Sequence, residues 1–170
     1  KQWRAVRKIL NFVYMIKRLY IDTSVFGGYF DEEFEEATRF FFDNIIRRQV
    51  LIVVSDILEV EIYEAPDHII EFYESLPKDL IERAKLTKEA LELSEKYISE
   101  KVVGRISRAD CQHIAIATLN NVEALISWNY KHIVNLEKIR GYNAINLKAG
   151  YRILEIRTPK EVFNDEKGKS

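Results

Sequence analysis

Three acidic residues lie beside segments that the sequence predicts as strands or helices, and together they could do chemistry. Asp22 directly follows an apolar run, Glu61 lies about two turns into a helix after a second run, and Asp110 lies in the first turn of a further helix. In a parallel sheet, ligands bind outside the carboxyl ends of the strands. We therefore expect the three carboxylates to converge at that edge.

A cluster of carboxylates predicts a cation. Carboxylates that lie close together raise one another's pKa unless a positive ion lies between them, and such hard oxygen ligands suit Mg²⁺ or Mn²⁺. The ion can activate a water molecule and stabilise the charge that develops on a phosphodiester. Asn129 follows another predicted strand and adds a fourth polar position at the same edge. The set therefore predicts a divalent-metal site for phosphodiester hydrolysis.

Each acidic residue has a simpler interpretation when it is taken alone. A strand-end aspartate such as Asp22 is often only a turn former or a helix cap. Glu61 shares its helix with Glu59 and Glu64, and periodicity does not choose among the three. Asp110 in a first turn would also favour the helix dipole. Only the combination of the three favours a functional site.

Three further side chains near these positions leave two interpretations open. His113, on the helix of Asp110, could ligate a metal, but we favour a packed histidine that supports a ligand. Trp128 and Tyr130 follow a predicted strand and could stack on nucleic-acid bases. Aromatic residues in that position are more often part of the core, which is the interpretation that we favour.

The elements that would position these residues alternate between strands and helices. Apolar, β-favouring runs predict strands at 19–21, 51–54, 124–126 and 153–156. Capping residues and helical periodicity predict helices at 31–48, after Ser55, at 67–76, at 87–101 and at 107–120. Because such alternation implies right-handed crossovers, we expect an α/β fold, a three-layer α/β/α sandwich around a central parallel sheet of four to five strands.

The composition predicts one globular domain. The 170 residues have the length of an ordinary domain, which we expect at 17–163 with a frayed tail at 164–170. The net charge of -1 provides no general attraction to nucleic acid. The single cysteine, Cys111, excludes an intrachain disulfide and a thiolate zinc cluster, which favours a reducing cytoplasm. We expect no membrane segment, because a span needs about 20 apolar residues.

Residues 1–16 predict a basic amphipathic extension. The stretch 1–18 holds six basic and no acidic side chains, and its apolar residues have helical spacing. The only methionine, Met15, lies just before the first predicted strand, so we expect the native start near it. The extension could be an arm for a partner or a polyanion, but we favour a segment that packs incidentally.

Four segments resemble successive motifs of PIN-domain proteins. They are Tyr-Ile-Asp-Thr-Ser at 20–24, Ser-Asp-Ile-Leu-Glu-Val-Glu-Ile at 55–62, Ser-Arg-Ala-Asp-Cys-Gln-His-Ile-Ala-Ile-Ala at 107–117, and Ser-Trp-Asn-Tyr-Lys-His at 127–132 followed by Asn135. The last segment is similar to that of the VapC toxins of toxin–antitoxin systems. The likeness covers about residues 17–162, and four motifs in the family's order argue against a chance match.

The resemblance implies a Mg²⁺- or Mn²⁺-dependent ribonuclease. Asp22, Glu61 and Asp110 fall on the family's acidic ligand positions, and Thr23 or Ser24 would assist through a hydroxyl. The family also implies an RNA substrate, a homodimer and a cognate antitoxin that occupies the acidic groove. Basic residues near the predicted site would position the RNA backbone, namely Arg105, Arg108, Lys131 and Lys138.

One departure from the family pattern motivates a second hypothesis. Many PIN domains have a further aspartate where this sequence has Asn129, and an amide can ligate a metal but carries no charge. We therefore expect weaker retention of a second metal ion, with a single-metal mechanism or low activity. The alternative is a catalytically weak PIN fold that binds RNA or a protein partner. An aspartate-based phosphotransfer domain is disfavoured, because Ser24 stands where such domains have a second aspartate.

Overall fold

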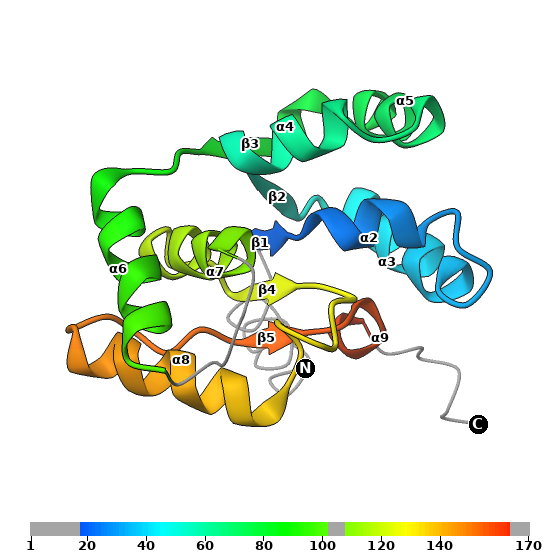
Figure 1. Cartoon of the computed structure of the whole chain (residues 1–170). Helices are drawn as coiled ribbons and strands as arrows, with labels where there is room; N and C mark the ends of the chain where they lie inside the picture. The colour runs from blue at the N-terminus through cyan, green and yellow to red at the C-terminus, as the bar shows by residue number, and fades with distance from the viewer. Residues whose placement is uncertain (1–17, 102–107, 164–170) are drawn as a thin grey trace, which may run out of the picture.

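The computed structural model describes residues 18–101 and 108–163, which form one parallel sheet with helices on both faces (Figure 1). The sheet has the strand order β3-β2-β1-β4-β5. Its strands are β1 (Arg18–Ile21), β2 (Leu51–Ser55), β3 (Ile81–Ala84), β4 (Ala124–Ile126) and β5 (Ile156–Arg157). The expected extension at 1–16, the expected tail at 164–170 and Arg105 lie outside the described residues. The α/β class and the central parallel sheet predicted from the sequence are confirmed.

The helices follow the strands in the alternating order that the sequence predicts. They are α2 (Thr23–Gly28), α3 (Glu35–Arg48), α4 (Asp56–Tyr63), α5 (Asp67–Ser75), α6 (Lys88–Ser99), α7 (Arg108–Leu119), α8 (Leu136–Lys148) and α9 (Pro159–Val162). A short 3-10 helix, Lys78–Leu80, precedes β3. None of the helices in the two described ranges is long and apolar enough to cross a membrane.

Two apolar cores, one on each face of the sheet, explain why the sequences of the strands are continuous hydrophobic runs. Along β1, Tyr20 points into the core formed with α6, α7 and α8, while Leu19 and Ile21 point into the core formed with α2, α3, α4 and α5. Successive side chains of a strand lie on opposite faces, so a strand covered on both sides is apolar throughout. The result is the three-layer arrangement, with β1 between β2 and β4 at its centre.

Several elements differ from those predicted from the sequence. The segment after Asp22, where no helix was predicted, forms α2, and the helix expected from Asp31 begins at Glu35 because Asp31 closes a turn through its backbone and side chain. Neither the short edge strand β3 nor helix α8 was predicted from the sequence. Helix α8 contains Gly141, and glycine in a helix interior weakens the helical signal.

The strand expected at 153–156 forms only from Ile156. The side chain of Asn143 explains the difference, because it binds the backbone of Leu154 on both sides. Its amide donates to the carbonyl of Leu154 at 3.1 Å, and its oxygen accepts from the Leu154 N–H at 2.7 Å. The chain is thereby tied to α8 until Ile156 pairs with Leu125 of β4.

Candidate active site

Asp22 lies at the carboxyl end of the central strand, where the sequence predicted it. Its backbone N–H donates to the carbonyl of Ile126 at 2.9 Å, which extends the pairing of β1 and β4 by one residue. Its side chain is 5% exposed and is the N-cap of α2. The predicted cap and the predicted site residue are therefore the same group.

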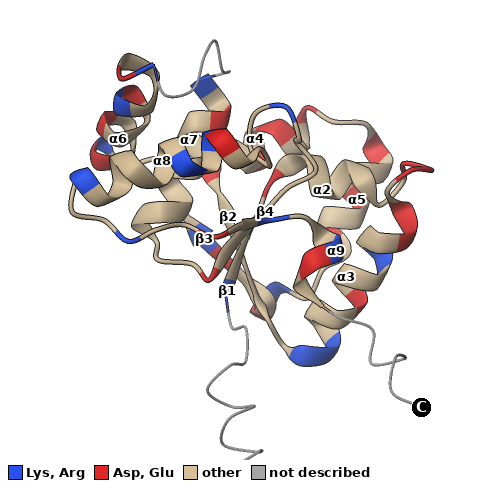
Figure 2. Ribbon diagram, turned by 90° about the horizontal axis from the view of Figure 1, so that it is seen from below, with Lys and Arg blue, Asp and Glu red and all other residues tan. Residues whose placement is uncertain are grey.

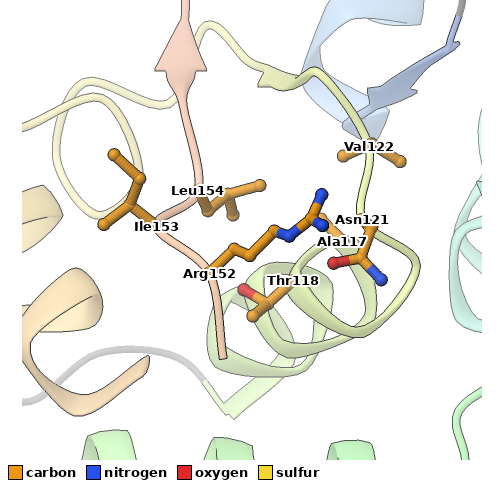
Figure 3. A pocket seen from close by; sticks show the side chains of 7 residues that line it. All are labelled: Ala117, Thr118, Asn121, Val122, Arg152, Ile153 and Leu154. Carbon is orange, nitrogen blue, oxygen red and sulfur yellow. The ribbon is translucent and has the colours of Figure 1, made fainter. Parts of the chain in front are cut away.

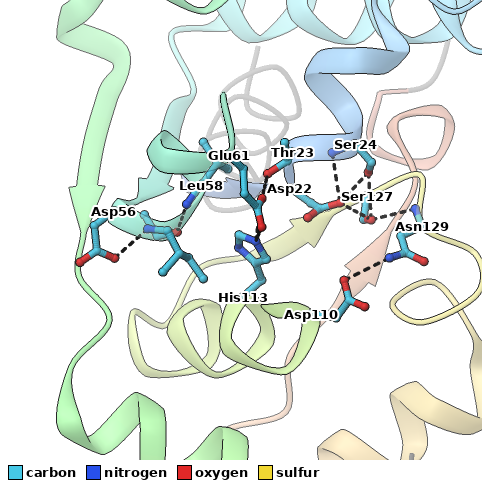
Figure 4. A network of polar contacts seen from close by, with 12 residues as sticks. Asp22, Thr23, Ser24, Asp56, Leu58, Glu61, Asp110, His113, Ser127 and Asn129 are labelled. Atoms are coloured by element: carbon cyan, nitrogen blue, oxygen red, sulfur yellow. Dashed lines mark hydrogen bonds and ion pairs between the residues drawn. The ribbon is translucent and has the colours of Figure 1, made fainter. Parts of the chain in front are cut away.

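Two hydroxyls orient the carboxylate of Asp22. Ser24 Oγ donates to Asp22 Oδ2 at 2.5 Å, and Ser127 Oγ donates to the same oxygen at 2.8 Å (Figure 4). Ser24 Oγ also accepts from the backbone N–H of Trp128 at 2.9 Å, which ties the ends of β1 and β4 together. The sequence predicted a role for Ser24. It did not single out Ser127, although that residue directly follows β4 and thus carried the same positional signal as Asn129.

Glu61 projects from α4 toward Asp22's neighbour Thr23. Thr23 Oγ1 donates to Glu61 Oε2, and His113 Nε2 lies 3.2 Å from the same oxygen. Glu59, the competing acid, instead accepts from the Tyr73 hydroxyl at 2.6 Å and pairs with an arginine of β3. Of Glu59 and Glu61, it is therefore Glu61 that lies beside Thr23 and His113, a distinction that periodicity alone could not make.

His113 is a buried histidine, as we favoured from the sequence, with only 1% of its surface exposed. Its Nδ1 lies 2.6 Å from the hydroxyl of Tyr20, which in turn lies 2.7 Å from Ser55 Oγ. Nε2 faces Glu61, and because an ionised carboxylate only accepts, Nε2 must carry the proton. A chain of hydrogen bonds thus runs through the core from Ser55 by way of Tyr20 and His113 to Glu61.

The charges of the site favour an ion pair between His113 and Glu61. Burial alone would lower the pKa of His113, but the hydrogen bond to Glu61 and the negative charges of Asp22, Glu61 and Asp110 outweigh it, so this pKa is raised. Burial alone would raise the pKa of Glu61, but hydrogen bonds from His113 and Thr23 outweigh it, so this pKa is lowered. Both shifts favour the charged forms. All three predicted acids therefore lie near one buried histidine.

Asp110 and Asn129 form the second part of the site. Asn129 Nδ2 donates to Asp110 Oδ1 at 3.2 Å, its Oδ1 accepts from the His132 N–H at 3.0 Å, and its backbone N–H donates to Ser127 Oγ at 2.9 Å. The amide oxygen is thus engaged by the loop. In this arrangement Asn129 orients Asp110 and links it to Ser127.

The donor atoms suit a divalent cation, but they form two hydrogen-bonded groups. In one group, Asp22 is linked through Ser127 and Asn129 to Asp110; in the other, Glu61 is bonded to Thr23 and His113 (Figure 4). Within 18–101 and 108–163, no three carboxylate, imidazole or thiol side chains form a group that could hold a metal ion. The chemistry of the donors, carboxylate and hydroxyl oxygens, is that preferred by Mg²⁺ and Mn²⁺.

The basic residues expected beside the site have different surroundings. Arg108 forms an ion pair with Glu95 of α6. Lys138 Nζ donates to the backbone carbonyl of Lys131 at 2.6 Å, so Lys138, in the first turn of α8, lies beside Lys131 on the loop between β4 and α8. The paired lysines remain candidates for phosphate contacts, whereas the charge of Arg108 is partly neutralised.

A pocket at the other end of α7 is separate from the acidic site. Its lining comes from the last turn of α7, the segment before β4 and the segment before β5, namely Ala117, Thr118, Asn121, Val122, Arg152, Ile153 and Leu154 (Figure 3). Asp110 lies in the first turn of the same helix. The length of α7 therefore separates the pocket from the carboxylates.

Two solved structures with a similar fold are chains of protein–DNA complexes. One is a chain of VapBC2 from Rickettsia felis bound to a DNA fragment from their promoter, with 11% identity, a TM-score of 0.52, and coverage of 83% of this chain and 98% of that chain. The other is a chain of FitAB bound to an IR36 DNA fragment, with 11% identity, a TM-score of 0.56, and coverage of 87% and 99%. The sequence matches no protein-family model and no curated protein. The likenesses show the fold alone, and they agree with the PIN-like α/β fold predicted from the sequence.

Proposed function

Starting from the PIN-domain toxin fold, we propose that this chain is a Mg²⁺- or Mn²⁺-dependent endoribonuclease. The observation that carries the proposal is that Asp22, Glu61 and Asp110, from three different parts of the chain, lie near His113 at the carboxyl edge of the sheet, although they do not form one metal-binding group in the described residues (Figure 4). Ligands of parallel α/β sheets bind at that edge. The preference for RNA comes from the family resemblance.

Asp22, Glu61 and Asp110 would hold the ion. Because the three acids form no single metal-binding group within the described residues, Glu61 and the pair Asp22 and Asp110 would have to move closer together to do so. When bound, Mg²⁺ or Mn²⁺ would supply Lewis acidity for hydrolysis of a phosphodiester. The hydroxyls of Ser24 and Ser127 keep the Asp22 carboxylate in place, since both donate to one of its oxygens. His113 keeps Glu61 ionised through the proton on Nε2. Preorganised carboxylates of this kind lower the cost of assembling the site.

The proposed role includes partners. The names of both similar structures describe complexes with DNA, and the motifs resemble those of toxins paired with an antitoxin. We therefore propose that this chain is the toxin of a toxin–antitoxin pair, that it acts in the cytoplasm, and that it forms a homodimer. Light scattering on the purified protein, alone and with the product of an adjacent small reading frame, measures both assemblies.

A cleavage assay tests the nuclease proposal. Purified protein is incubated with single-stranded RNA or DNA in Mg²⁺, in Mn²⁺ or in EDTA, beside Asp22→Asn, Glu61→Gln and Asp110→Asn. We expect cleavage of RNA with either ion, none in EDTA, and a loss of at least about 100-fold in each variant. Glu64→Gln is the matched control, because it removes one acid from the end of α4 without touching the site.

Two results would contradict the mechanism, namely cleavage that persists in EDTA or cleavage that survives both Asp22→Asn and Asp110→Asn. A catalytically weak RNA-binding or protein-binding module is the second candidate. It is favoured by the neutral Asn129 beside Asp110 and by the separation of the acids into two groups. Retained RNA binding without cleavage, and without a calorimetric signal in a Mn²⁺ titration, would select the module.

A further inference from the structure

The loop after β4 carries one aromatic ring inward and one outward. Trp128 is 6% exposed, its Nε1 donates to Thr38 Oγ1 at 3.0 Å, and its ring stacks on Phe34 with the centroids 4.5 Å apart. Tyr130 is 50% exposed, and its ring centroid lies 6.3 Å from that of Trp128. The expectation that both rings belong to the core is therefore correct for Trp128 and wrong for Tyr130. Packing in the core therefore does not explain why an aromatic residue stands at position 130.

The backbone beneath Tyr130 is held in place by Asn129. The N–H groups of Ile133 and Val134 both donate to the Asn129 carbonyl, at 3.0 and 2.8 Å, and His132 N–H donates to its side chain. Asn129 also contacts Asp110 through its amide nitrogen. A ring on such a loop starts from an ordered backbone, so less backbone freedom remains to be lost when a ligand binds. The backbone that carries Tyr130 is therefore held next to the proposed reaction site.

Three lysines lie on or beside the segment that carries Tyr130. Lys138 Nζ lies 2.6 Å from the Lys131 carbonyl, and Lys160 Nζ lies 5.8 Å from the centre of the Trp128 ring. Elsewhere, helices α3 and α6 carry both basic and acidic residues, whereas α4 and α5 carry acidic residues and neither Lys nor Arg (Figure 2). Two acids also face Tyr130, Glu33 and Glu161, and with burial they raise its pKa.

Of these two acids, Glu161 is already engaged, since it accepts from the N–H and the hydroxyl of Thr158. Beside these two carboxylates, Lys131, Lys138 and Lys160 provide the positive charge that a phosphate chain near Tyr130 would meet. An exposed aromatic ring among cations is the arrangement with which proteins bind single-stranded nucleic acid: the ring stacks on a base and the cations follow the backbone.

We propose that Tyr130 is the stacking platform for one base of single-stranded RNA, whose backbone passes over Lys131 and Lys138 toward Asp110. This inference rests on the proposed function, because it names how the substrate of that site is held. It assigns Tyr130 to substrate binding. The bond cleavage itself belongs to the carboxylates.

Binding measurements in a protein that cannot cleave test the platform. Fluorescence anisotropy with a labelled single-stranded RNA is measured in EDTA for Asp22→Asn alone and combined with Tyr130→Ala or Tyr130→Phe. We expect Tyr130→Ala to weaken binding about tenfold or more, and Tyr130→Phe to restore it, since stacking needs the ring and not the hydroxyl. Tyr63→Ala is the matched control, because Tyr63 is similarly exposed, at 54%, but lies on α4.

A second RNA without bases separates stacking from other contacts. On this abasic RNA, Tyr130→Ala should have no effect beyond twofold, about the precision of the measurement. The platform is overturned if Tyr130→Ala binds normal RNA as well as its parent, if the loss is equal on abasic RNA, or if the parent binds no RNA. A wild-type protein that binds through Tyr130 but cuts nothing leaves the platform in place and refutes the nuclease proposal. Preferential binding of single-stranded DNA would overturn the RNA assignment.

Discussion

Gly27 and Gly28 are neighbours at the end of α2, yet only at Gly28 should an added methyl group lower the stability of the fold. A Cβ at Gly28 would lie 2.7 Å from two atoms of the Trp128 ring and 3.1 Å from Thr38 Oγ1. The ring cannot move away cheaply, because it is buried against Phe34 and its Nε1 is bonded to Thr38. A Cβ at Gly27 meets nothing within 4 Å.

The magnitudes follow from overpacking and from helix propensity. Forcing an extra methyl group into a packed core costs about 1–3 kcal/mol, so Gly28→Ala should lower the free energy of unfolding by that amount. For a chain of this length, each 1 kcal/mol corresponds to a fall in Tm of roughly 2–4 °C. Gly27→Ala should leave stability unchanged or raise it by up to about 1 kcal/mol, because alanine loses less backbone entropy on folding.

Urea unfolding of the two variants and the wild type, followed by circular dichroism, measures the difference. The packing argument is refuted if Gly28→Ala unfolds within about 0.5 kcal/mol of the wild type, the usual range for surface substitutions. It is also refuted if Gly27→Ala loses as much stability as Gly28→Ala, because a common loss would reflect the helix and not the contact with Trp128.

Two further predictions concern buried titratable groups. The pKa of His113 in the folded protein is raised above 6.5, so the stability that His113 contributes is full below pH 6.5 and is lost as the pH rises through the folded pKa. The pKa of Glu61 in the folded protein is lowered below 4.5, so the stability that Glu61 contributes is full above pH 4.5 and is lost as the pH falls through the folded pKa. Urea unfolding at a series of pH values should therefore show that His113→Gln lowers the free energy of unfolding most between pH 4.5 and pH 6.5. A loss of stability that does not change with pH would contradict the ion pair. Burial, with the negative charge of Asp110, raises the pKa of the Cys111 thiol to about 11, so a disulfide reagent at about pH 8 should label it only in denaturant. Rapid labelling of the native protein would show that the thiol is accessible.

Local signals made part of the site predictable from the sequence. Asp22 directly follows an apolar strand, and Ser55 and Thr87 precede helices that they cap, so each is recognisable from a few neighbouring residues. Strand ends of a parallel sheet lie on one edge, which is why residues far apart in the chain, such as Asp22 and Asn129, could be expected at that edge. The motifs near Asp110 and Asn129 added to the same grouping.

The remaining features depend on contacts between distant segments. Glu61 could not be separated from Glu59 and Glu64 until Thr23 and His113 were seen to bond to it. Likewise, Trp128 and Tyr130 are two residues apart in one loop, and only the position of Phe34 shows which of them is buried. Periodicity describes one element at a time, so it carries no information about such partners.

The hydrogen-bonded chain through the core also sets the requirements for moving this site to another protein. A designer who copied only Asp22, Glu61 and Asp110 onto a new sheet would leave Glu61 without the imidazole that keeps it ionised. The imidazole would in turn need a hydroxyl like that of Tyr20, which projects from the middle of the central strand. The smallest unit that could be transplanted therefore includes strand β1, with Tyr20, and helix α7, with His113. A graft limited to surface loops would lack both side chains.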